Sequence, residues 1–357
     1  MRPVHLLALA LAVALPLAAH AQTSATPRRT VPLTPPVAVP CDGADTTCIA
    51  PEVPREFRGV WVASVSNIDW PSKPGLSTAE QQAELLAILD RTEAQRLNAL
   101  ILQIRPAADA LYKSSIEPWS EYLTGRQGRA PAPAWDPLAF AVAEAHRRGL
   151  ELHTWFNPYR ARHPSAKGPL SKLHLANTAP ALVKKYGTHL WMDPGESAVR
   201  KRTLRVVLDV VKRYDIDGVH LDDYFYPYKE RTANGTTEFP DVRSWKKYVA
   251  SGGTLSRDDW RRENVNTLVR ELNEQIHAAK PWVKFGVSPF GIWRPGYPEQ
   301  VKGFDAYEQL YADSKLWWAN NWVDYFTPQL YWPIAKPDSI LSSKVLPRCR
   351  RRSWWNG

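Results

Sequence analysis

The chain has 357 residues, 44% of them hydrophobic and 23% charged, a balance that is typical of globular proteins and excludes an intrinsically disordered chain. Its formal net charge is +10, but much of the basic excess lies in residues 341–357, which contain no acidic residue. Because the rest of the chain carries little excess positive charge, this distribution argues against a DNA-binding domain and against nucleic acid as a partner. The 16 Trp residues favour carbohydrate instead, because sugar rings stack on flat aromatic side chains, although Trp is also common in protein cores.

Residues 1–21 have the pattern of a secretory signal peptide. Arg2 precedes an apolar run over residues 6–17 that is too short to span a bilayer, and Ala19-His20-Ala21 is a small-x-small cleavage site. We expect export to the periplasm or cell envelope, with cleavage after Ala21 and no transmembrane segment. No Cys follows the cleavage site directly, so the sequence does not support a lipoprotein anchor.

Residues 22–54 contain seven Pro and are predicted to form a stiff, extended tether. Six residues separate Cys41 from Cys48 within this segment. In an oxidising compartment this spacing favours a small disulfide loop, with two free thiols as the alternative. Two Cys without nearby His supply too few ligands for a zinc site.

From Arg55 onward, short apolar segments alternate with segments of helical periodicity, which is typical of βαβ units. We expect strands at residues 59–65, 99–105, 150–157, 218–224, 284–289 and 323–331. We expect helices at residues 78–95, 138–148, 196–214, 257–279 and 313–320. This order fits an α/β TIM (β/α)₈ barrel over residues 55–340 better than a doubly wound sheet, and no G-x-G-x-x-G turn follows any of these strands.

Alternation within each strand selects the side chains that point into the barrel. In the fourth expected strand, Val219 and Leu221 face the helices, whereas His220, Asp222 and Tyr224 face the axis. The same rule selects the other inward residues: Trp61, Gln103, Arg105, His153, Trp155, Asn157, Ser288, Thr327, Gln329 and Tyr331. Several of these polar residues lie at the carboxyl ends of their strands, where active sites of this fold are built, so we expect the functional site there.

Seven segments carry a resemblance to a known family. They are Phe-Arg-Gly-Val-Trp-Val-Ala at 57–63, Asn-Ile-Asp-Trp-Pro at 67–71, Gln-Ile-Arg-Pro-Ala-Ala-Asp-Ala at 103–110, Trp-Phe-Asn-Pro-Tyr-Arg at 155–160, Asp-Gly-Val-His-Leu-Asp-Asp-Tyr-Phe-Tyr-Pro at 217–227, Ser-Pro-Phe-Gly at 288–291 and Pro-Gln-Leu-Tyr-Trp at 328–332. In order and spacing they resemble the glycosyl hydrolase-like 10 family, from about Glu56 to Ile340. The resemblance implies a TIM barrel that acts on glycan.

Within that family the chain most resembles envelope enzymes that cleave peptidoglycan strands already stripped of stem peptides. That branch includes lipoproteins, so the missing lipoprotein cleavage motif is a departure. The family would also continue with two further strands and their helices, whereas residues 341–357 form a basic tail without a strand or helix pattern. We therefore expect the barrel to be truncated or altered after about residue 340, with Cys349 unpaired.

Glycosidic hydrolysis usually needs two carboxylates, one as proton donor and one as base or nucleophile. Asp222 is the first candidate, and Asp223 is its expected partner if the chain turns at the strand end, with a loop cap as the alternative role. We expect Arg105 to pair with Asp222 and to lower its pKa. The reserve candidates for the acid are Asp69, Glu117 and Glu121. His220 is expected to be a packed core histidine.

If the substrate carries N-acetyl groups, its own amide is another possible nucleophile, positioned by Asp222 and Tyr331. The expected substrate-binding residues are Trp61, Arg105, Trp155, Asn157, Tyr224, Ser288, Gln329, Tyr331 and Trp332. The candidates for sugar stacking are Trp61, Trp70, Trp119, Trp155, Trp293 and Trp332.

The sequence thus predicts an exported glycoside hydrolase that cleaves cell-wall glycan and uses no metal or other cofactor. One alternative is a glycan-binding barrel without catalysis, which would need the aromatic residues but not Asp222. Another is a metal-dependent hydrolase such as a polysaccharide deacetylase, which would need clustered His and Asp ligands. His153 and His220 fall on neighbouring expected strands, but no further His stands at ligand spacing.

Overall fold

The structure is a computed structural model and describes residues 38–40, 47–49, 56–233 and 235–333. In the N-terminal unit, β1 (Ala38–Pro40) and β2 (Thr47–Ile49) form a short antiparallel pair in which Val39 lies opposite Cys48. The predicted signal peptide, the Cys41 partner of the expected disulfide, and the tail with Cys349 lie outside the described residues.

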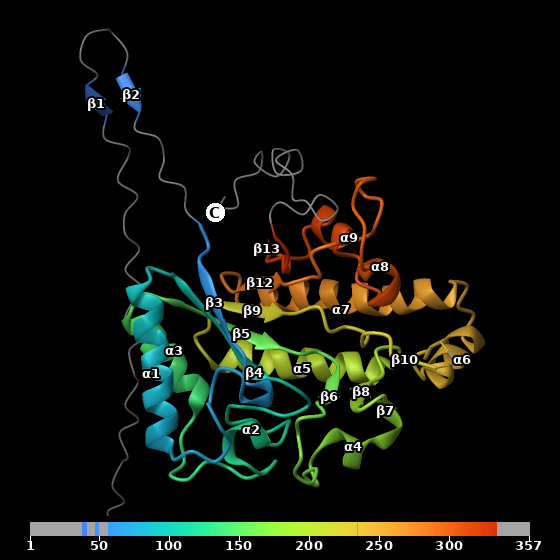
Figure 1. Ribbon diagram of the computed structural model, residues 1–357, viewed down its shortest axis with the longest axis horizontal. Coiled ribbons are helices and arrows are strands. Elements are labelled where there is room, and N and C mark those ends of the chain that lie inside the picture. The colour runs from blue at the N-terminus through green and yellow to red at the C-terminus, as the bar shows by residue number, and fades with distance from the viewer. Residues whose placement is uncertain (1–37, 41–46, 50–55, 234, 334–357) are drawn as a thin grey trace, which may run out of the picture. The chain divides into compact units, whose positions relative to one another are not determined.

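The second unit is built on a curled sheet of parallel strands (Figure 1). Its six strands are β3 (Gly59–Val62), β4 (Ala99–Arg105), β5 (Glu151–Phe156), β9 (Gly218–Leu221), β12 (Lys284–Val287) and β13 (Tyr325–Phe326). Each strand pairs in parallel with the next one of this series, in the order β3-β4-β5-β9-β12-β13. A doubly wound sheet would reverse its order at a switch point, so this sequential order confirms the predicted α/β barrel topology.

The predicted helices are also confirmed, each within two residues of its expected ends. They are α1 (Thr78–Ala94), α3 (Pro137–Arg147), α5 (Ser197–Arg213), α7 (Arg257–Ala279) and α9 (Ser314–Ala319). Side chains cap several of their first turns: Ser77 and Glu80 form a reciprocal capping box on α1, and Ser256 accepts a hydrogen bond from the Asp259 N–H on α7.

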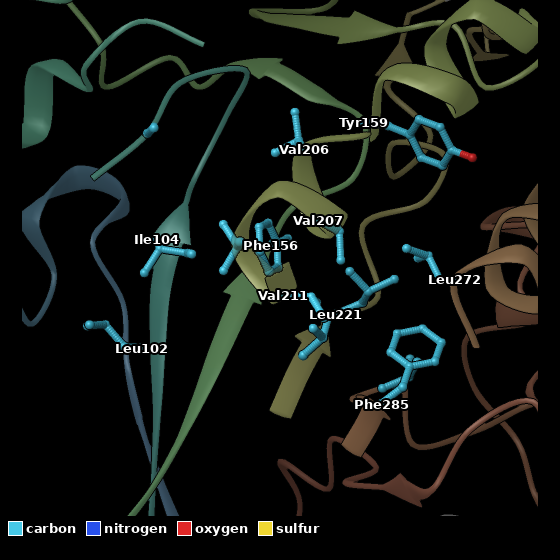
Figure 2. Close-up of a cluster of buried hydrophobic side chains, with 14 of the residues drawn as sticks. Leu102, Ile104, Phe156, Tyr159, Val206, Val207, Val211, Leu221, Leu272 and Phe285 are labelled. Carbon is cyan, nitrogen blue, oxygen red and sulfur yellow. The ribbon is translucent and has the colours of Figure 1, made fainter. Parts of the chain in front are cut away.

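The hydrophobic core lies between the sheet and the helices. Figure 2 shows Phe156, Leu221 and Phe285, from three neighbouring strands, close to Val207 of α5 and Leu272 of α7. All five side chains are fully buried, and burial of one such side chain typically contributes about 1.5–3 kcal/mol. The alternation rule is therefore confirmed for the helix-facing side of these strands.

The barrel interior contains a layer of polar aromatic side chains. Tyr325 Oη lies 2.7 Å from Nδ1 of His153 and 3.0 Å from Nδ1 of His220. Glycine makes room for this layer, because a Cβ at Gly286 would overlap the Tyr325 ring and one at Gly218 would overlap His153. Burial lowers the pKa of His220 to about 3, so its ring is neutral, which confirms its prediction as a packed core histidine.

Several shorter elements lie in segments for which the sequence predicted none. An antiparallel sheet of order β6-β8-β7 lies between β5 and α5, and consists of β6 (Arg160–Arg162), β7 (Val183–Tyr186) and β8 (His189–Met192). The others are α2 (Glu121–Thr124), α4 (Leu175–Thr178), α6 (Val242–Ala250), α8 (Ala306–Gln309), the pair β10 (Arg231–Thr232) and β11 (Gly235–Thr236), and 3₁₀ turns at Val65–Asn67 and Pro180–Leu182. Most of these elements span only two to four residues, too few for a periodic pattern.

Candidate active site

Asp222 follows directly on β9, which ends at Leu221, and its side chain is 5% exposed. Its Oδ2 atom accepts hydrogen bonds from Asn157 Nδ2 at 2.6 Å and from Trp155 Nε1 at 3.2 Å. Its Oδ1 atom accepts from the backbone N–H of Tyr224 at 3.2 Å. The carboxyl ends of β5 and β9 thus bring Asp222, Asn157 and Trp155 together, as the alternation rule predicted.

Buried Gln103 on β4 fixes the orientation of Asn157. Gln103 Oε1 accepts from the backbone N–H groups of Ser64 at 2.9 Å and Val65 at 2.8 Å, so its Nε2 must point the other way. Nε2 donates to Asn157 Oδ1 at 2.6 Å, which leaves the Asn157 amide nitrogen facing Asp222. A relay of side-chain amides therefore connects the loop after β3 to the Asp222 carboxylate.

Asp223 lies beside Asp222 and is 2% exposed. Its Oδ1 atom accepts from Gln329 Nε2 at 3.0 Å, and its Oδ2 atom accepts from the hydroxyl of Tyr228. Both partners belong to segments near the carboxyl ends of strands, β13 for Gln329 and β9 for Tyr228. The Asp223 side chain is therefore held at the same end of the barrel as Asp222, bonded to its own loop through Tyr228 and to the segment after β13 through Gln329.

Ser288 is fully buried and contacts Gln329, the partner of Asp223. Its hydroxyl donates to the carbonyl of Thr327 at 2.8 Å, and its own carbonyl accepts from Gln329 Nε2 at 3.1 Å. The expectation that the Ser288 side chain faces substrate is wrong, because the hydroxyl bonds the segment that follows β13.

The two adjacent carboxyl groups disfavour full ionisation. Burial, followed by the charge of Asp223, raises the pKa of Asp222 to about 6, against the opposing charge of Arg160. Burial also raises the pKa of Asp223, against its hydrogen bonds from Tyr228 and Gln329. The pair therefore retains a proton at a higher pH than isolated carboxyl groups would.

Arg105 does not pair with Asp222, so that prediction is wrong. Its Nε and Nη2 atoms each lie 2.7 Å from an oxygen of Glu117, and both side chains are fully buried. Arg202 of α5 adds a third contact, with its Nε 3.3 Å from Glu117 Oε1. Arg105 Nη1 also donates to the carbonyl of Asn157 at 2.5 Å. Arg105 thus binds the site's backbone from the helix side and does not bind substrate.

A bulge in β4 explains why alternation misplaced Arg105. Gln103 lies opposite Trp155, but the register then shifts and Arg105 lies opposite Phe156. Phe156 belongs to the helix-facing core, so the side chain of Arg105 is on that face as well. One extra residue in a strand reverses the facing of everything after it.

The reserve candidates for the acid have structural roles. Glu117 forms the buried ion pair with Arg105. Asp69 Oδ2 accepts from the backbone N–H of Ala63 at 2.8 Å, and Glu121 accepts from the backbone N–H of Lys167 at 2.7 Å. None of the three is in hydrogen-bond contact with Asp222 or Asp223 in the part of the chain that the structure describes.

Aromatic side chains surround the two carboxyl groups. The ring of Trp61 lies 6.1 Å from that of Trp155, centroid to centroid. Tyr331 is 78% exposed, and the charges of Asp223 and Asp222 add to burial in raising its pKa, which places its hydroxyl near the pair. Trp332 is half-buried beside Gly291, where a Cβ would overlap its ring.

The other stacking candidates lie apart from these residues. Trp70 is fully buried and donates through Nε1 to the carbonyl of Gln81 at 2.9 Å, so its prediction as a sugar-stacking residue is wrong. Trp119 is partly buried and packs against the core. Trp293 stacks with the ammonium of Lys315, 4.8 Å from its ring centroid, and donates to Asp313.

Arg160 is the charged residue beside the pair that strand alternation missed. It is 3% exposed, its guanidinium carbon lies 4.9 Å from the centroid of the Tyr224 ring, and its charge lowers the pKa of both Asp222 and Asp223. Arg160 ends the motif at residues 155–160, which was its only signal in the sequence. It lies beyond β5, where strand alternation no longer predicts which way a side chain points.

Within residues 56–233 and 235–333, no three His, Cys, Asp or Glu side chains gather as a candidate metal site. The helices of that part are also too short or too polar to cross a bilayer.

Comparisons with known proteins place the chain in a family. The glycosyl hydrolase-like 10 family profile matches residues 56–343. Glycosyl hydrolase YngK of Bacillus subtilis (strain 168) is 48% identical over 287 residues, which cover 79% of this chain and 55% of that protein. Glycosyl hydrolase DigH of Escherichia coli (strain K12) is 34% identical over 344 residues, covering 90% of this chain and 75% of that protein. The chain thus spans about half the length of the Bacillus subtilis relative.

Two solved structures resemble the fold more distantly. Alpha-L-fucosidase isoenzyme 2 from Paenibacillus thiaminolyticus aligns with a TM-score of 0.45 and 14% identity over 67% of this chain and 33% of its own. The galactosidase domain of the alpha-galactosidase-sucrose kinase AgaSK aligns with a TM-score of 0.38 and 11% identity over 66% and 27%. From the profile match and the two relatives it follows that the chain belongs to the glycosyl hydrolase-like 10 family.

Proposed function

We propose that this protein is an exported glycoside hydrolase that cleaves the glycan strands of peptidoglycan after their stem peptides have been removed. The observation that carries the proposal is the buried pair Asp222–Asp223 at the carboxyl end of β9. The raised pKa values of the pair allow one carboxyl group to hold a proton while the other is ionised. Glycosidic hydrolysis usually needs one carboxyl group in each of these states within the same site.

The pair can carry both halves of the reaction. The protonated carboxyl group donates its proton to the glycosidic oxygen as the C–O bond breaks. Water then supplies the hydroxyl group of the new reducing end and returns a proton to the pair, which restores the acid. The ionised carboxylate stabilises the positive charge that develops at the sugar carbon. Where the sugar carries an N-acetyl group, the amide oxygen of that group can attack the same carbon, positioned by Asp222 and Tyr331.

The substrate class rests on three observations. Aromatic rings at the mouth of the barrel, among them Trp61, Trp155 and Tyr331, are suited to sugar stacking. Residues 1–21 have the pattern of an export signal. The motifs, above all residues 217–227, resemble the branch of the family that acts on peptide-free strands.

We expect purified glycan strands without stem peptides to be cleaved faster than intact peptidoglycan, because a peptide on the lactyl group must fit against the loops that surround the pair. Digestion of both substrates, with products identified by mass spectrometry, measures the difference. Equal rates on both, or cleavage of peptide bonds alone, would refute the proposal. Binding of the strands without any product would favour the glycan-binding alternative.

The amide relay provides a second test. Gln103→Met keeps the size of the side chain but frees the Asn157 amide from its fixed orientation, and so loosens Asp222. We expect kcat on peptide-free strands to fall about 10- to 100-fold, since small errors in the placement of catalytic groups have effects of this order. Steady-state kinetics on the folded variant provides the measurement.

Gln81→Met is the matched control. Gln81 is also buried, but its Nε2 donates to the backbone carbonyls of Leu76 at 2.8 Å and Leu123 at 3.1 Å, away from the pair. We expect this variant to lose stability without a comparable loss of kcat. A Gln103→Met variant with wild-type kcat would show that the relay does not position Asp222.

A further inference from the structure

Arg160 is a buried cation that forms no direct ion pair with a carboxylate of residues 56–233 and 235–333. Its Nε donates to the carbonyl of Pro106 at 2.8 Å and its guanidinium lies over the Tyr224 ring. Within the described residues its two terminal nitrogens have no hydrogen-bond acceptor, and no carboxylate lies within 4.0 Å of them. Other buried arginines of the chain are paired, Arg105 with Glu117 and Arg261 with Asp241. Because an unpaired buried charge is costly, Arg160 is suited to an anion supplied from outside.

Two neutral histidines lie near this cation. Burial, and then the charge of Arg160, lowers the pKa of His163 to about 4 and also lowers that of His189; the two rings are 5.4 Å apart. The backbone N–H of Ser165 donates to His163 Nδ1 at 3.2 Å, so the ring proton of neutral His163 is on Nε2. His163 therefore offers an N–H donor on Nε2, three residues along the chain from Arg160.

The anion site adjoins the carboxyl pair. The Tyr224 ring that supports Arg160 belongs to the residue whose backbone N–H donates to Asp222. The charge of Arg160 reaches both Asp222 and Asp223, since it lowers the pKa of each. A glycan bound at the pair would thus place its substituents within reach of Arg160.

Peptidoglycan strands carry one anionic group that depends on the stem peptide. In the intact polymer the lactyl carboxyl group of the muramyl residue is bound in a neutral amide to the peptide. Removal of the peptide leaves a free carboxylate, which a guanidinium binds through two parallel hydrogen bonds. We propose that Arg160, assisted by His163, binds this free lactyl carboxylate and so selects peptide-free strands, an inference that rests on the proposed function.

The test compares two forms of the same peptide-free strands: one with free lactyl carboxylates, the other with each carboxylate converted to the primary amide, which has nearly the same size and no charge. We expect the wild-type protein to have a kcat/KM about 10- to 100-fold higher on the carboxylate form, the range typical of a charge-assisted pair. Arg160→Gln should lose this preference: kcat/KM should fall on both forms to the extent that the catalytic pair feels the lost charge, but about 10- to 100-fold further on the carboxylate form. Arg160→Lys should keep part of it, because the charge remains without the two-pronged geometry.

Arg294→Gln is the control, since Arg294 lies on the segment after β12 and is paired with Glu308 at 3.0 Å. Arg294→Gln should keep the wild-type preference.

An equal loss on both substrates in Arg160→Gln would overturn the inference, because Arg160 would then act on the carboxyl pair and not on substrate. Equal wild-type rates on both forms would also overturn it and would leave the proposed function intact. Failure of the wild-type protein to cleave either form would refute the proposed function itself. The comparison of the two substrates with the wild-type protein needs no variant, so it tests the preference for the free carboxylate even if Arg160→Gln does not fold.

Discussion

Asp222→Asn is expected to abolish turnover and, at the same time, to stabilise the protein at neutral and alkaline pH. Asn keeps the size of the side chain and can still accept from Asn157 and Trp155, but it can neither carry a proton to the leaving group nor stabilise positive charge. The loss of such a group typically lowers kcat about 10³-fold or more. We expect glycan affinity to stay close to wild type.

The gain in stability follows from the raised pKa of Asp222. A carboxyl group with a pKa of about 6 in the folded protein and 3.8 ordinarily disfavours folding when it is ionised. The cost is fully present above pH 6 and disappears as the pH falls below the ordinary pKa. Urea unfolding of Asp222→Asn and wild type should therefore show the stabilisation at pH 8 and little of it at pH 4.

Asp223→Asn is the informative comparison, because it removes the same charge one residue away. We expect it to lose turnover as well, since hydrogen bonds from Gln329 and Tyr228 hold Asp223 beside Asp222. If Asp222→Asn kept the wild-type rate while Asp223→Asn was inactive, the catalytic roles assigned to the pair would be wrong.

Glu117→Gln is expected to destabilise the protein strongly without removing catalysis from the molecules that fold. The substitution leaves Arg105 as a fully buried cation without a counter-charge, and loss of one partner of such a pair typically costs about 3–5 kcal/mol. Denaturant unfolding measures the loss of stability, and kcat per folded molecule measures catalysis. Replacement of both partners, Arg105→Met with Glu117→Met, should recover much of the stability. A variant with normal unfolding and a kcat lowered about 10³-fold would instead identify Glu117 as the acid.

Local pattern was sufficient to predict the frame of the fold. Helical periodicity located the five helices, and short apolar runs located the six strands, although β3, β9, β12 and β13 are shorter than the runs predicted. The pair Asp222 and Asn157 was also predictable, because each stands at the carboxyl end of a strand whose facing is regular. Arg105 was not, because the bulge at the end of β4 depends on how β4 pairs with β5 and leaves no mark in the sequence.

Arg160 shows a different limit. It lies on β6, a strand of three residues that exists only because it pairs with β8, some thirty positions further along the chain. Neither strand has enough residues to show alternation, so the facing of Arg160 is decided by tertiary contacts alone. The sequence could mark Arg160 as part of a motif but could not place it beside the carboxyl groups.

A hydrogen bond joins the two ends of the segment that forms the small sheet β6-β8-β7, which carries Arg160. The Met192 N–H donates to the carbonyl of Tyr159 at 2.7 Å, so the chain leaves the barrel after β5 and returns to nearly the same point before α5. The segment between these points holds Arg160, His163 and His189, whereas the carboxyl pair lies outside it, directly after β9. The residues proposed to bind the lactyl carboxylate and the carboxyl pair are thus encoded in separate stretches of the gene. Evolution can exchange the first, as it does the variable loops of other barrels, and so redirect the enzyme to a differently decorated glycan while the chemistry stays unchanged.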